Sequence, residues 1–286
     1  MKKHLMALLL LVSLLCTVLS GCGDGSAEQT PEDRAQANTI NVGIAQDLDE
    51  SLDPHKTVKA GTREVMFNVF EGLMKPTSNG DLTPAVAESY TVSDDHRTYT
   101  FTLREGVKFH NGDAVTAEDV IYSIQRCIAP AETGIVPVEA FSIITDIQAL
   151  DERTVAITIS EPSNEFISYL TTAILPADYE EQDTAPVGTG PFRFVSRTAQ
   201  DSIVLEKFDE YWGTPANLDK VTFKIIENAD SLLMSLQSGA IDLCAHLTST
   251  QVAQLGEDFQ IEEGTMNLVQ ALYLNNAVAP FDNELV

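Results

Sequence analysis

The sequence predicts an α/β fold built as two lobes or sub-domains. Apolar residues make up 44% of the 286 residues, which is ample for a hydrophobic core. The second half of the chain alternates strand-like and helix-like apolar patterns, an order typical of a mostly parallel sheet covered by helices. The first half is richer in strand-like segments separated by tight turns, which indicates hairpins.

The N-terminus has the pattern of an export signal. Lys2 and Lys3 precede an almost unbroken apolar run over residues 5–18, which is too short for a comfortable membrane span. The run leads into Leu19-Ser20-Gly21-Cys22, which resembles the lipobox of bacterial lipoproteins. That resemblance implies a signal peptide over residues 1–21 and a diacylglyceryl group on Cys22, and two acyl chains hold a protein firmly on a membrane.

Residues 22–38 are predicted to form a flexible tether. The stretch consists mainly of Gly, Ser, Ala, Gln and acidic residues, so folding is expected to begin near Thr39. The chain as a whole is strongly acidic, with a net charge of −26. Because such a surface repels the phosphates of nucleic acid, we expect no nucleic-acid partner.

The first half of the folded region is predicted to start with a strand over 39–45 and a loop that ends at Pro54. A helix follows from Thr62, its predicted N-cap, to Met74, with apolar residues three and four positions apart. A β-rich stretch is predicted at 99–109 and a helix at 116–127. They are followed by a hairpin, 143–150 with 154–159, and a short helix at 163–170.

The second half opens with a glycine-rich loop over 186–190. Gly239 is predicted to end a helix, because glycine is favoured just after a helix C-terminus. A hairpin is predicted at 192–196 with 202–208, and a strand at 221–226. A helix at 229–238, a strand at 241–245 and a helix at 249–255 follow. The last predicted element is a buried strand at 269–274.

The sequence contains no residue set that supports an enzyme or a cofactor site. Gly188-Thr189-Gly190-Pro191 lacks the third glycine of a dinucleotide-binding loop, and there is neither a Walker phosphate loop nor a Gly-x-Ser-x-Gly elbow. Asp47, Asp49 and Ser51 have the spacing that opens a calcium loop, but Leu52 stands where that loop requires glycine. The histidines are too widely separated for a local metal site, so we expect no metal.

The cysteines beyond the lipid site do not indicate a disulfide framework. Cys127 and Cys244 lie far apart in the sequence, and each has apolar neighbours. Both are therefore predicted to be buried thiols.

A series of short motifs resembles the large, peptide-type class of extracellular solute-binding proteins of ABC importers. Together, in this order, they are highly specific and cover nearly everything after the tether. The motifs are Ser51-Leu52-Asp53-Pro54-His55, Val69-Phe70-Glu71-Gly72-Leu73, Pro84-Ala85-Val86-Ala87-Glu88-Ser89, the stretch from Tyr99 to Gly112, Thr116-Ala117-Glu118-Asp119-Val120, Gly188-Thr189-Gly190-Pro191-Phe192, Tyr211-Trp212-Gly213, Gln237-Ser238-Gly239-Ala240-Ile241-Asp242, and Leu274-Asn275-Asn276 with Pro280-Phe281.

The resemblance implies a periplasmic-binding-protein-like fold of type II, of the large three-domain class, with the ligand enclosed between two lobes. Residues 39–60 and 186–268 would form the α/β domain of the N-terminal lobe, and residues 61–185 a smaller inserted domain. Residues 269–286 would begin a second lobe that is largely missing. Since the chain has roughly half the length of a large two-lobe protein, we expect a fragment or a truncated gene.

The resemblance also implies a function and a site. The protein would be a monomeric substrate-binding component that captures oligopeptides or dipeptides at the extracytoplasmic face of the cell membrane and works with a permease and an ATPase. In peptide-binding relatives the segment after the first motif runs beside the peptide backbone, which here corresponds to Val58, Lys59 and Ala60. Further candidate ligand contacts come from the glycine-rich loop and are Gly188, Thr189 and Gly190. Tyr211 and Trp212 are expected to pack in the core or between strands rather than to form a platform for the ligand.

Three alternatives stay open from the sequence. The same fold could hold a nickel chelate, haem or an oligosaccharide in place of a peptide. The chain could be a secreted hydrolase, which no motif supports. It could also be a truncated product that binds no ligand.

Overall fold

A computed structural model describes residues 30–128, 134–264 and 274–283. The chain separates into two compact units, Met1–Ala245 and His246–Val286. The first unit contains both larger sheets. None of the helices in the described ranges combines the length and apolar character needed to cross a membrane.

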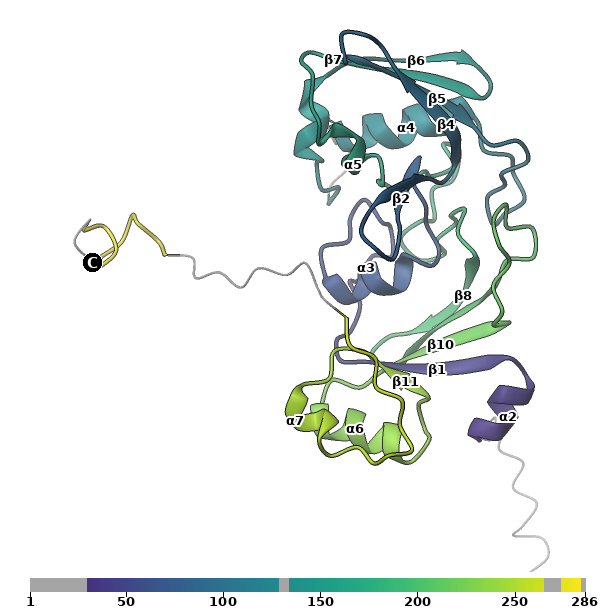
Figure 1. Ribbon diagram of the computed structural model, residues 1–286, viewed down its shortest axis with the longest axis vertical. Coiled ribbons are helices and arrows are strands. Elements are labelled where there is room, and N and C mark those ends of the chain that lie inside the picture. Colours follow the sequence, from purple (N-terminus) through teal and green to yellow (C-terminus); the bar gives the residue numbers. More distant parts are fainter. Residues whose placement is uncertain (1–29, 129–133, 265–273, 284–286) are drawn as a thin grey trace, which may run out of the picture. The chain divides into compact units, whose positions relative to one another are not determined.

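The first unit contains a mixed five-stranded sheet with the order β11-β1-β10-β9-β8 (Figure 1). Its strands are β1 (Thr39–Ile44), β8 (Phe192–Thr198), β9 (Ser202–Lys207), β10 (Lys220–Ile225) and β11 (Leu243–Cys244). Strand β1 runs parallel to β10 and β11, but β9 is antiparallel to both β10 and β8. The predicted mostly parallel sheet is therefore wrong for this half, because the 192–208 hairpin joins the same sheet.

Helix α6 (Ala229–Gln237) follows β10 and confirms the helix predicted there. The Asn228 side chain caps it by accepting a hydrogen bond from the Ser231 amide at 2.8 Å. Gly239 ends the helix with a φ of +75°, a conformation that favours glycine. The apolar face of α6 is buried through Leu232, Leu233 and Leu236.

Helix α3 (Ala60–Met66) starts earlier and ends sooner than the sequence pattern predicts. Lys59 is its N-cap residue, and Thr62 lies buried inside the helix, where its hydroxyl accepts a hydrogen bond from the Asp49 amide at 2.7 Å. The chain then leaves the helix, and Met74 belongs to strand β2 (Met74–Pro76). The apolar residues after Met66, such as Val69 and Phe70, are buried in the core although they lie in a loop. Their spacing of three and four positions resembles that of a helix, which explains the longer prediction.

Helix α2 (Pro31–Gln36) corrects the prediction that residues 22–38 form a tether up to Asn38. Thr30 and Asp33 form a capping box, and the side chain of Arg34 is buried with only 2% of its surface exposed. A helix that buries an arginine is part of the fold, so the described folded region begins at Thr30 rather than near Thr39.

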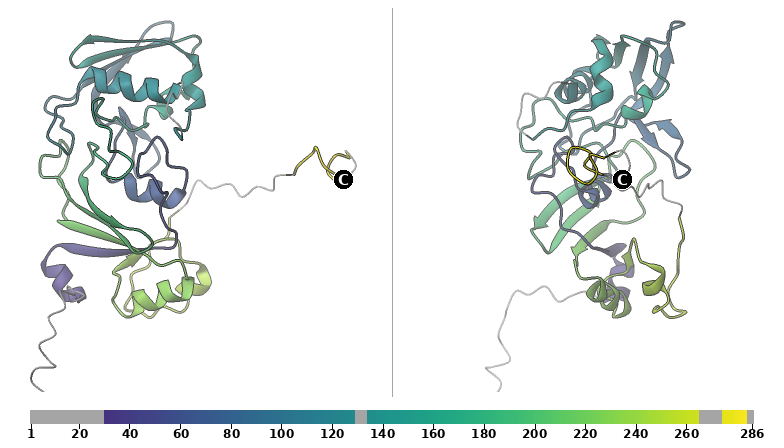
Figure 2. Two further views of the ribbon diagram at one scale, coloured as in Figure 1. Left: turned by 180° about the vertical axis from the view of Figure 1, so that it is seen from behind. Right: turned by 90° about the vertical axis from the view of Figure 1, so that its left-hand side faces the viewer.

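A second sheet of the first unit has four antiparallel strands in the order β4-β5-β7-β6. Its strands are β4 (Ala87–Val92), β5 (Thr98–Leu103), β6 (Ile144–Asp151) and β7 (Thr154–Ile159). The alternating burial of β5 and β7 and the predicted hairpin are confirmed. Helix α4 (Ala117–Ile128) lies along this sheet, near η1 (Glu139–Ile143) and α5 (Phe166–Tyr169) (Figures 1 and 2). A further pair, β2 with β3 (Leu82–Pro84), completes the described strands.

The second unit contains α7 (Ser249–Val252), which begins at a capping box made by Thr248 and Gln251. The predicted strand over 269–274 lies, except for its last residue, outside the described residues. The division into domains at 39–60 with 186–268, 61–185 and 269–286 stays a prediction. Cys127 is a buried thiol as predicted, and Cys244 is half-buried and also unpaired.

Candidate functional site: the loop after β1

The candidate site is the loop between β1 and α3, which leaves the sheet at the carboxyl end of its parallel strands. Strands β1, β10 and β11 end at Ile44, Ile225 and Cys244 on this edge. In open α/β sheets, ligands bind beyond the carboxyl ends of the strands. Topology therefore places the residues between Gln46 and Ala60 where a ligand is expected.

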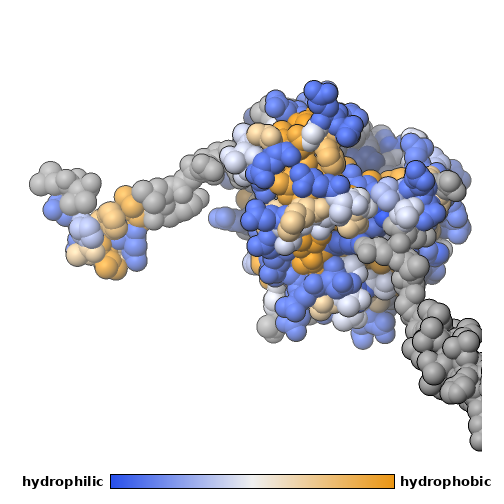
Figure 3. Space-filling view, turned by 90° about the horizontal axis from the view of Figure 1, so that it is seen from below, coloured by the Kyte–Doolittle hydropathy of each residue, from blue (hydrophilic) through white to orange (hydrophobic). Residues whose placement is uncertain are grey.

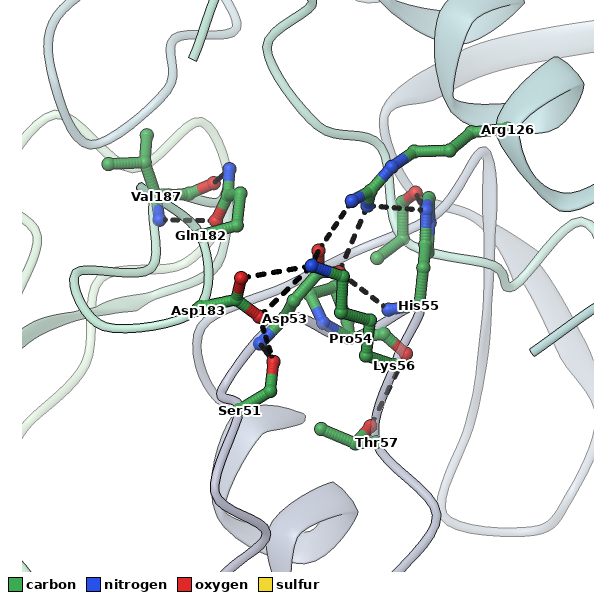
Figure 4. Close-up of polar contacts among 11 residues, drawn as sticks. Ser51, Asp53, Pro54, His55, Lys56, Thr57, Arg126, Gln182, Asp183 and Val187 are labelled. Carbon is green, nitrogen blue, oxygen red and sulfur yellow. Dashed lines mark hydrogen bonds and ion pairs between the residues drawn. The ribbon is translucent and has the colours of Figure 1, made fainter. Parts of the chain in front are cut away.

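A buried ion pair fixes the middle of this loop. The carboxylate of Asp53 is 1% exposed and pairs end-on with the guanidinium of Arg126 from α4, with Nη1–Oδ1 at 3.0 Å and Nη2–Oδ2 at 2.7 Å (Figure 4). Two parallel hydrogen bonds between charged partners define both distance and orientation. The pair therefore attaches the loop after β1 to the helix that covers the four-stranded sheet.

The residues beside Asp53 extend this network. The His55 amide donates to Asp53 Oδ1 at 2.9 Å, and the ring Nε2 of His55 lies 2.9 Å from the Ala173 carbonyl oxygen. The Lys56 ammonium lies 2.9 Å from the carboxylate of Asp183, which also accepts a hydrogen bond from the Ser51 hydroxyl. That hydroxyl and Lys56 lower the pKa of Asp183 below its usual range, so the carboxylate stays charged.

Asp183 is itself held in a short closed turn. The Gln182 side chain donates to the Val187 carbonyl and accepts from the Val187 amide, each at 2.9 Å (Figure 4). Gln182 is buried, with 4% of its surface exposed. The turn thus presents Asp183 to Ser51 and Lys56 from a fixed position.

Asp49 and Lys59 cross-link the two ends of the loop. Oδ2 of Asp49 accepts hydrogen bonds from the amides of Val58 at 3.2 Å and Lys59 at 2.9 Å. The Lys59 ammonium turns back to the Leu48 carbonyl at 2.9 Å. The Lys59 side chain therefore braces the loop, and the amides of Val58 and Lys59 are engaged within the chain.

Arg197 lies on the edge strand β8 and binds the first turn of the loop. Its Nη1 donates to the Asp49 carbonyl at 2.6 Å, and its Nη2 lies 3.4 Å from Oδ1 of Asp47. Arg197, Lys59 and Asp49 together give the loop a single preferred shape.

The braced loop ends in an exposed, extended segment. The side chain of Val58 is 62% exposed, and Lys59 has extended backbone angles of φ −71° and ψ 137°. Ala60 is the first residue of α3, and the first amides of a helix have no acceptor within the helix. Among the three predicted contact residues, the Ala60 N–H is therefore the amide best placed to donate to a ligand.

The structure places Gly188, Thr189 and Gly190, the further candidate ligand contacts, in the interior of the first unit. All three are buried, and a Cβ on Gly188 would lie 2.2 Å from the Val69 carbonyl oxygen. The Gly190 amide donates to that same oxygen at 2.9 Å. Close approach of two backbones thus explains the glycines, while their role toward a ligand stays a prediction.

His110 locks the glycine-rich loop from its other side. Its Nε2 lies 2.9 Å from the Gly190 carbonyl oxygen, and its Nδ1 accepts from the Gly188 amide at 3.3 Å. One donor and one acceptor on the ring are the arrangement of a neutral imidazole. Burial lowers the pKa of His110 to about 4. The hydrogen bond to Gly190 acts in the opposite direction but is the smaller effect.

Tyr211 and Trp212 surround a buried carboxylate, as expected for packing residues. The Tyr211 hydroxyl and the Trp212 indole N–H donate to Glu71 at 2.8 and 2.7 Å, and Lys75 pairs with Glu71 at 3.0 Å. Arg104 lies over the Trp212 ring at 4.4 Å from its centre. A cavity of about 280 Å³ adjoins this cluster and Phe67 at the end of α3.

Sequence reasoning missed the residues that shape the loop, namely Asp49, Arg126, Asp183 and Arg197. In the sequence, Asp49 stands out only through its calcium-loop spacing with Asp47 and Ser51. In the described part of the chain, no group of three or more His, Cys, Asp or Glu residues could hold a metal ion.

Comparison with known proteins identifies the family. Residues 81–286 match the bacterial extracellular solute-binding proteins, family 5. The chain belongs to this family. The glutathione-binding protein GsiB of Escherichia coli O1:K1 is 32% identical over 82% of this chain and 48% of its own length. The dipeptide-binding protein DppE of Bacillus subtilis (strain 168) is 29% identical over 94% of this chain and 55% of its own length.

Solved structures agree with the family 5 fold. The binding protein DppA of Helicobacter pylori, in complex with the peptide STSA, has a TM-score of 0.70 and 29% identity, over 76% of this chain and 48% of that protein. The periplasmic-binding-protein-like α/β fold predicted from the sequence is thereby confirmed. The chain spans about half the length of the relatives it matches.

Proposed function

We propose that this protein captures short peptides outside the cytoplasmic membrane and delivers them to the permease and ATPase of an ABC importer. Family 5 membership and relatives named for dipeptides and glutathione support this function. The protein's work is recognition, without a catalytic step and as a monomer. The alternative ligands are a nickel chelate, haem and an oligosaccharide, and calorimetric titration with each of them distinguishes them from a peptide.

The preformed edge at Val58–Ala60 is the observation that supports a peptide ligand. Asp49 already takes the amides of Val58 and Lys59, so the amide that this exposed and braced segment can offer to an extended peptide is that of Ala60, which need not be ordered first. Backbone hydrogen bonds are the same for any peptide sequence. The edge therefore suits a receptor that accepts many peptides.

Replacing Ala60 with proline tests this edge. Proline is well tolerated at the first position of a helix, and Lys59 already has the extended angles that a following proline requires. The Ala60→Pro variant should fold normally but lack the amide donor. Since one hydrogen bond contributes about 1 kcal/mol, and more to a charged partner, peptide affinity measured by calorimetry should fall roughly tenfold.

Ala60→Ser is the matched control, because it changes the side chain but keeps the amide. It should bind peptide like the unmodified protein. Equal affinities for the proline and serine variants, both correctly folded, would show that Ala60 does not donate to the ligand.

We further propose that the mature protein is anchored to the membrane through a diacylglyceryl group on Cys22, after removal of residues 1–21. The lipobox-like residues 19–22 support this. Cys22→Ser removes the sulfur to which the lipid is joined, so the variant should leave the membrane fraction for the soluble one. Cys16→Ser, in the signal itself, is the control that should stay lipid-anchored. Retention of the Cys22 variant in the membrane fraction would contradict the anchor.

A further inference from the structure

Helix α2 is docked on the first unit through a buried, two-pronged ion pair. Nε of Arg34 lies 2.7 Å from Oδ2 of Asp242, and Nη2 lies 2.6 Å from Oδ1. Nη2 also donates to the Gly239 carbonyl at 2.6 Å. Removing one partner of such a pair leaves the other charge uncompensated, which is strongly destabilising. Residues more than 200 positions apart in the sequence are therefore held together.

Other contacts make α2 part of the sheet edge. Oδ2 of Asp242 accepts a hydrogen bond from the Asn41 amide at 2.8 Å, so one carboxylate ties α2 to β1. Pro31 packs on the turn after α6, where a Cβ on Gly239 would lie 2.8 Å from the Pro31 ring. The helix is thus fitted to this turn by shape as well as by charge.

This docking shortens the reach of any anchor at Cys22. Thr30, where α2 is capped, lies eight Cα–Cα steps after Cys22. At about 3.6 Å per residue, a fully extended chain of this length spans at most about 29 Å. Were the chain undocked as far as Thr39, the limit would be about 61 Å. The docked helix therefore halves the distance that the lipid attachment allows.

We propose that α2 acts as a clip that directs one end of the first unit toward the membrane, within about 29 Å of the lipid surface. This inference rests on the proposed lipidation of Cys22. The membrane-facing surface is the clip end, defined as α2 together with residues 238–242. Strand β6 lies at the opposite end of the first unit (Figures 1 and 2), so in this orientation it would face away from the lipid.

The chemistry of the clip end indicates that the covalent tether orients the protein, without adsorption to lipid. Glu32 and Asp33 are exposed on α2, and no basic side chain other than the buried Arg34 lies within this helix. Figure 3, which views the molecule from below, shows hydrophilic and hydrophobic residues interspersed on that face. Anionic headgroups repel exposed carboxylates over a Debye length of about 8 Å, so the clip end stays near the bilayer without inserting.

Limited proteolysis tests the clip independently of the lipid. A glutamate-specific protease cuts after Glu32 only when α2 opens. The Arg34→Ala variant should be cut there about tenfold faster or more, as judged by mass spectrometry, with the rest of the fold intact. Arg193→Ala is the control, because Arg193 makes an exposed ion pair with Glu206 and should leave the cutting rate unchanged. Equal rates for both variants would overturn the clip.

Energy transfer tests the orientation in membranes that contain the lipidated protein. A donor dye is attached to Ser238→Cys at the clip end or to Leu150→Cys on β6, both in a Cys244→Ser background, and the acceptor is a headgroup-labelled lipid. Transfer should be strong from position 238 and weak from position 150. A Gly-Ser linker inserted between Gln29 and Thr30 leaves the clip closed and should reduce transfer from position 238.

The outcomes separate this inference from the proposed function. Equal transfer from positions 238 and 150 in the membrane-bound protein would overturn the orientation while leaving the anchor intact. Absence of the protein from the membrane fraction would instead refute the lipid anchor, and the orientation with it. The proteolysis result would then still decide whether α2 is docked.

Discussion

Replacing Arg126 with leucine should destabilise the protein by about 3–5 kcal/mol, because the buried Asp53 carboxylate would lose both guanidinium hydrogen bonds and keep only Lys56, at 4.0 Å, as a charged partner. The pair joins the loop after β1 to α4, so peptide affinity should also fall as the braced edge loosens. Chemical denaturation measures the first effect, and calorimetry on the folded fraction measures the second.

Two comparisons make this prediction specific. Arg193→Leu removes an exposed ion pair and should cost less than about 1 kcal/mol. In the double variant Asp53→Asn, Arg126→Leu, the uncompensated charge is absent, so part of the lost stability should return. A stability loss below about 1 kcal/mol for Arg126→Leu would contradict the role assigned to this pair.

Acid should weaken the protein through His110. The folded-state pKa of His110 is about 4, below the usual value of 6.5, so between these values the unfolded chain binds the proton that the folded protein excludes. The stability that neutral His110 provides is therefore complete above pH 6.5 and is lost as the pH falls toward 4. The expected loss is about 2–3 kcal/mol.

The His110→Phe variant isolates this effect. Near pH 7.5 it should be less stable than the unmodified protein, because the Gly188 amide and the Gly190 carbonyl lose their partner. The difference should shrink by about 2 kcal/mol at pH 4.5, where the unmodified protein loses the advantage of its neutral imidazole. His96→Asn, in an exposed turn with φ of +56°, should change neither value. A difference that is independent of pH would refute the assignment.

Elements with a complete local pattern could be predicted from the sequence. Strands β5 and β7 alternate apolar and polar residues, and the structure buries every second position. Helix α6 has its capping residue, its apolar face and its terminal glycine close together in the sequence. These signals act within a few residues, so no knowledge of distant partners is needed.

Elements that depend on distant partners were predicted wrongly or missed. Helix α2 has few apolar residues, and its docking rests on Asp242, which lies 208 residues away. The capping box of Thr30 and Asp33 was a local signal that could have revealed the helix. The helix predicted up to Met74 ends at Met66, and Gly72 further along packs directly on the backbone at Leu170 and Thr172, a contact that local spacing does not reveal.

The position of the candidate site could be predicted from the sequence, but the arrangement of its side chains could not. Its position was predicted by resemblance, since the segment over residues 58–60 follows the Ser-Leu-Asp-Pro-His motif. The inward direction of the Lys59 side chain could not be predicted, because its partners are the carbonyls of Asp47 and Leu48, whose arrangement depends on Arg197 from another strand. Such loop geometry becomes visible only in three dimensions.

Calorimetric titration of a full-length version of the protein with a mixed set of tripeptides tests the proposed function most directly. We predict binding at micromolar affinity or tighter, about −8 kcal/mol, with little dependence on side-chain identity. Parallel titrations use a nickel–histidine chelate, haem and an oligosaccharide. Heat from one of these three ligands, with none from any peptide, would contradict peptide capture.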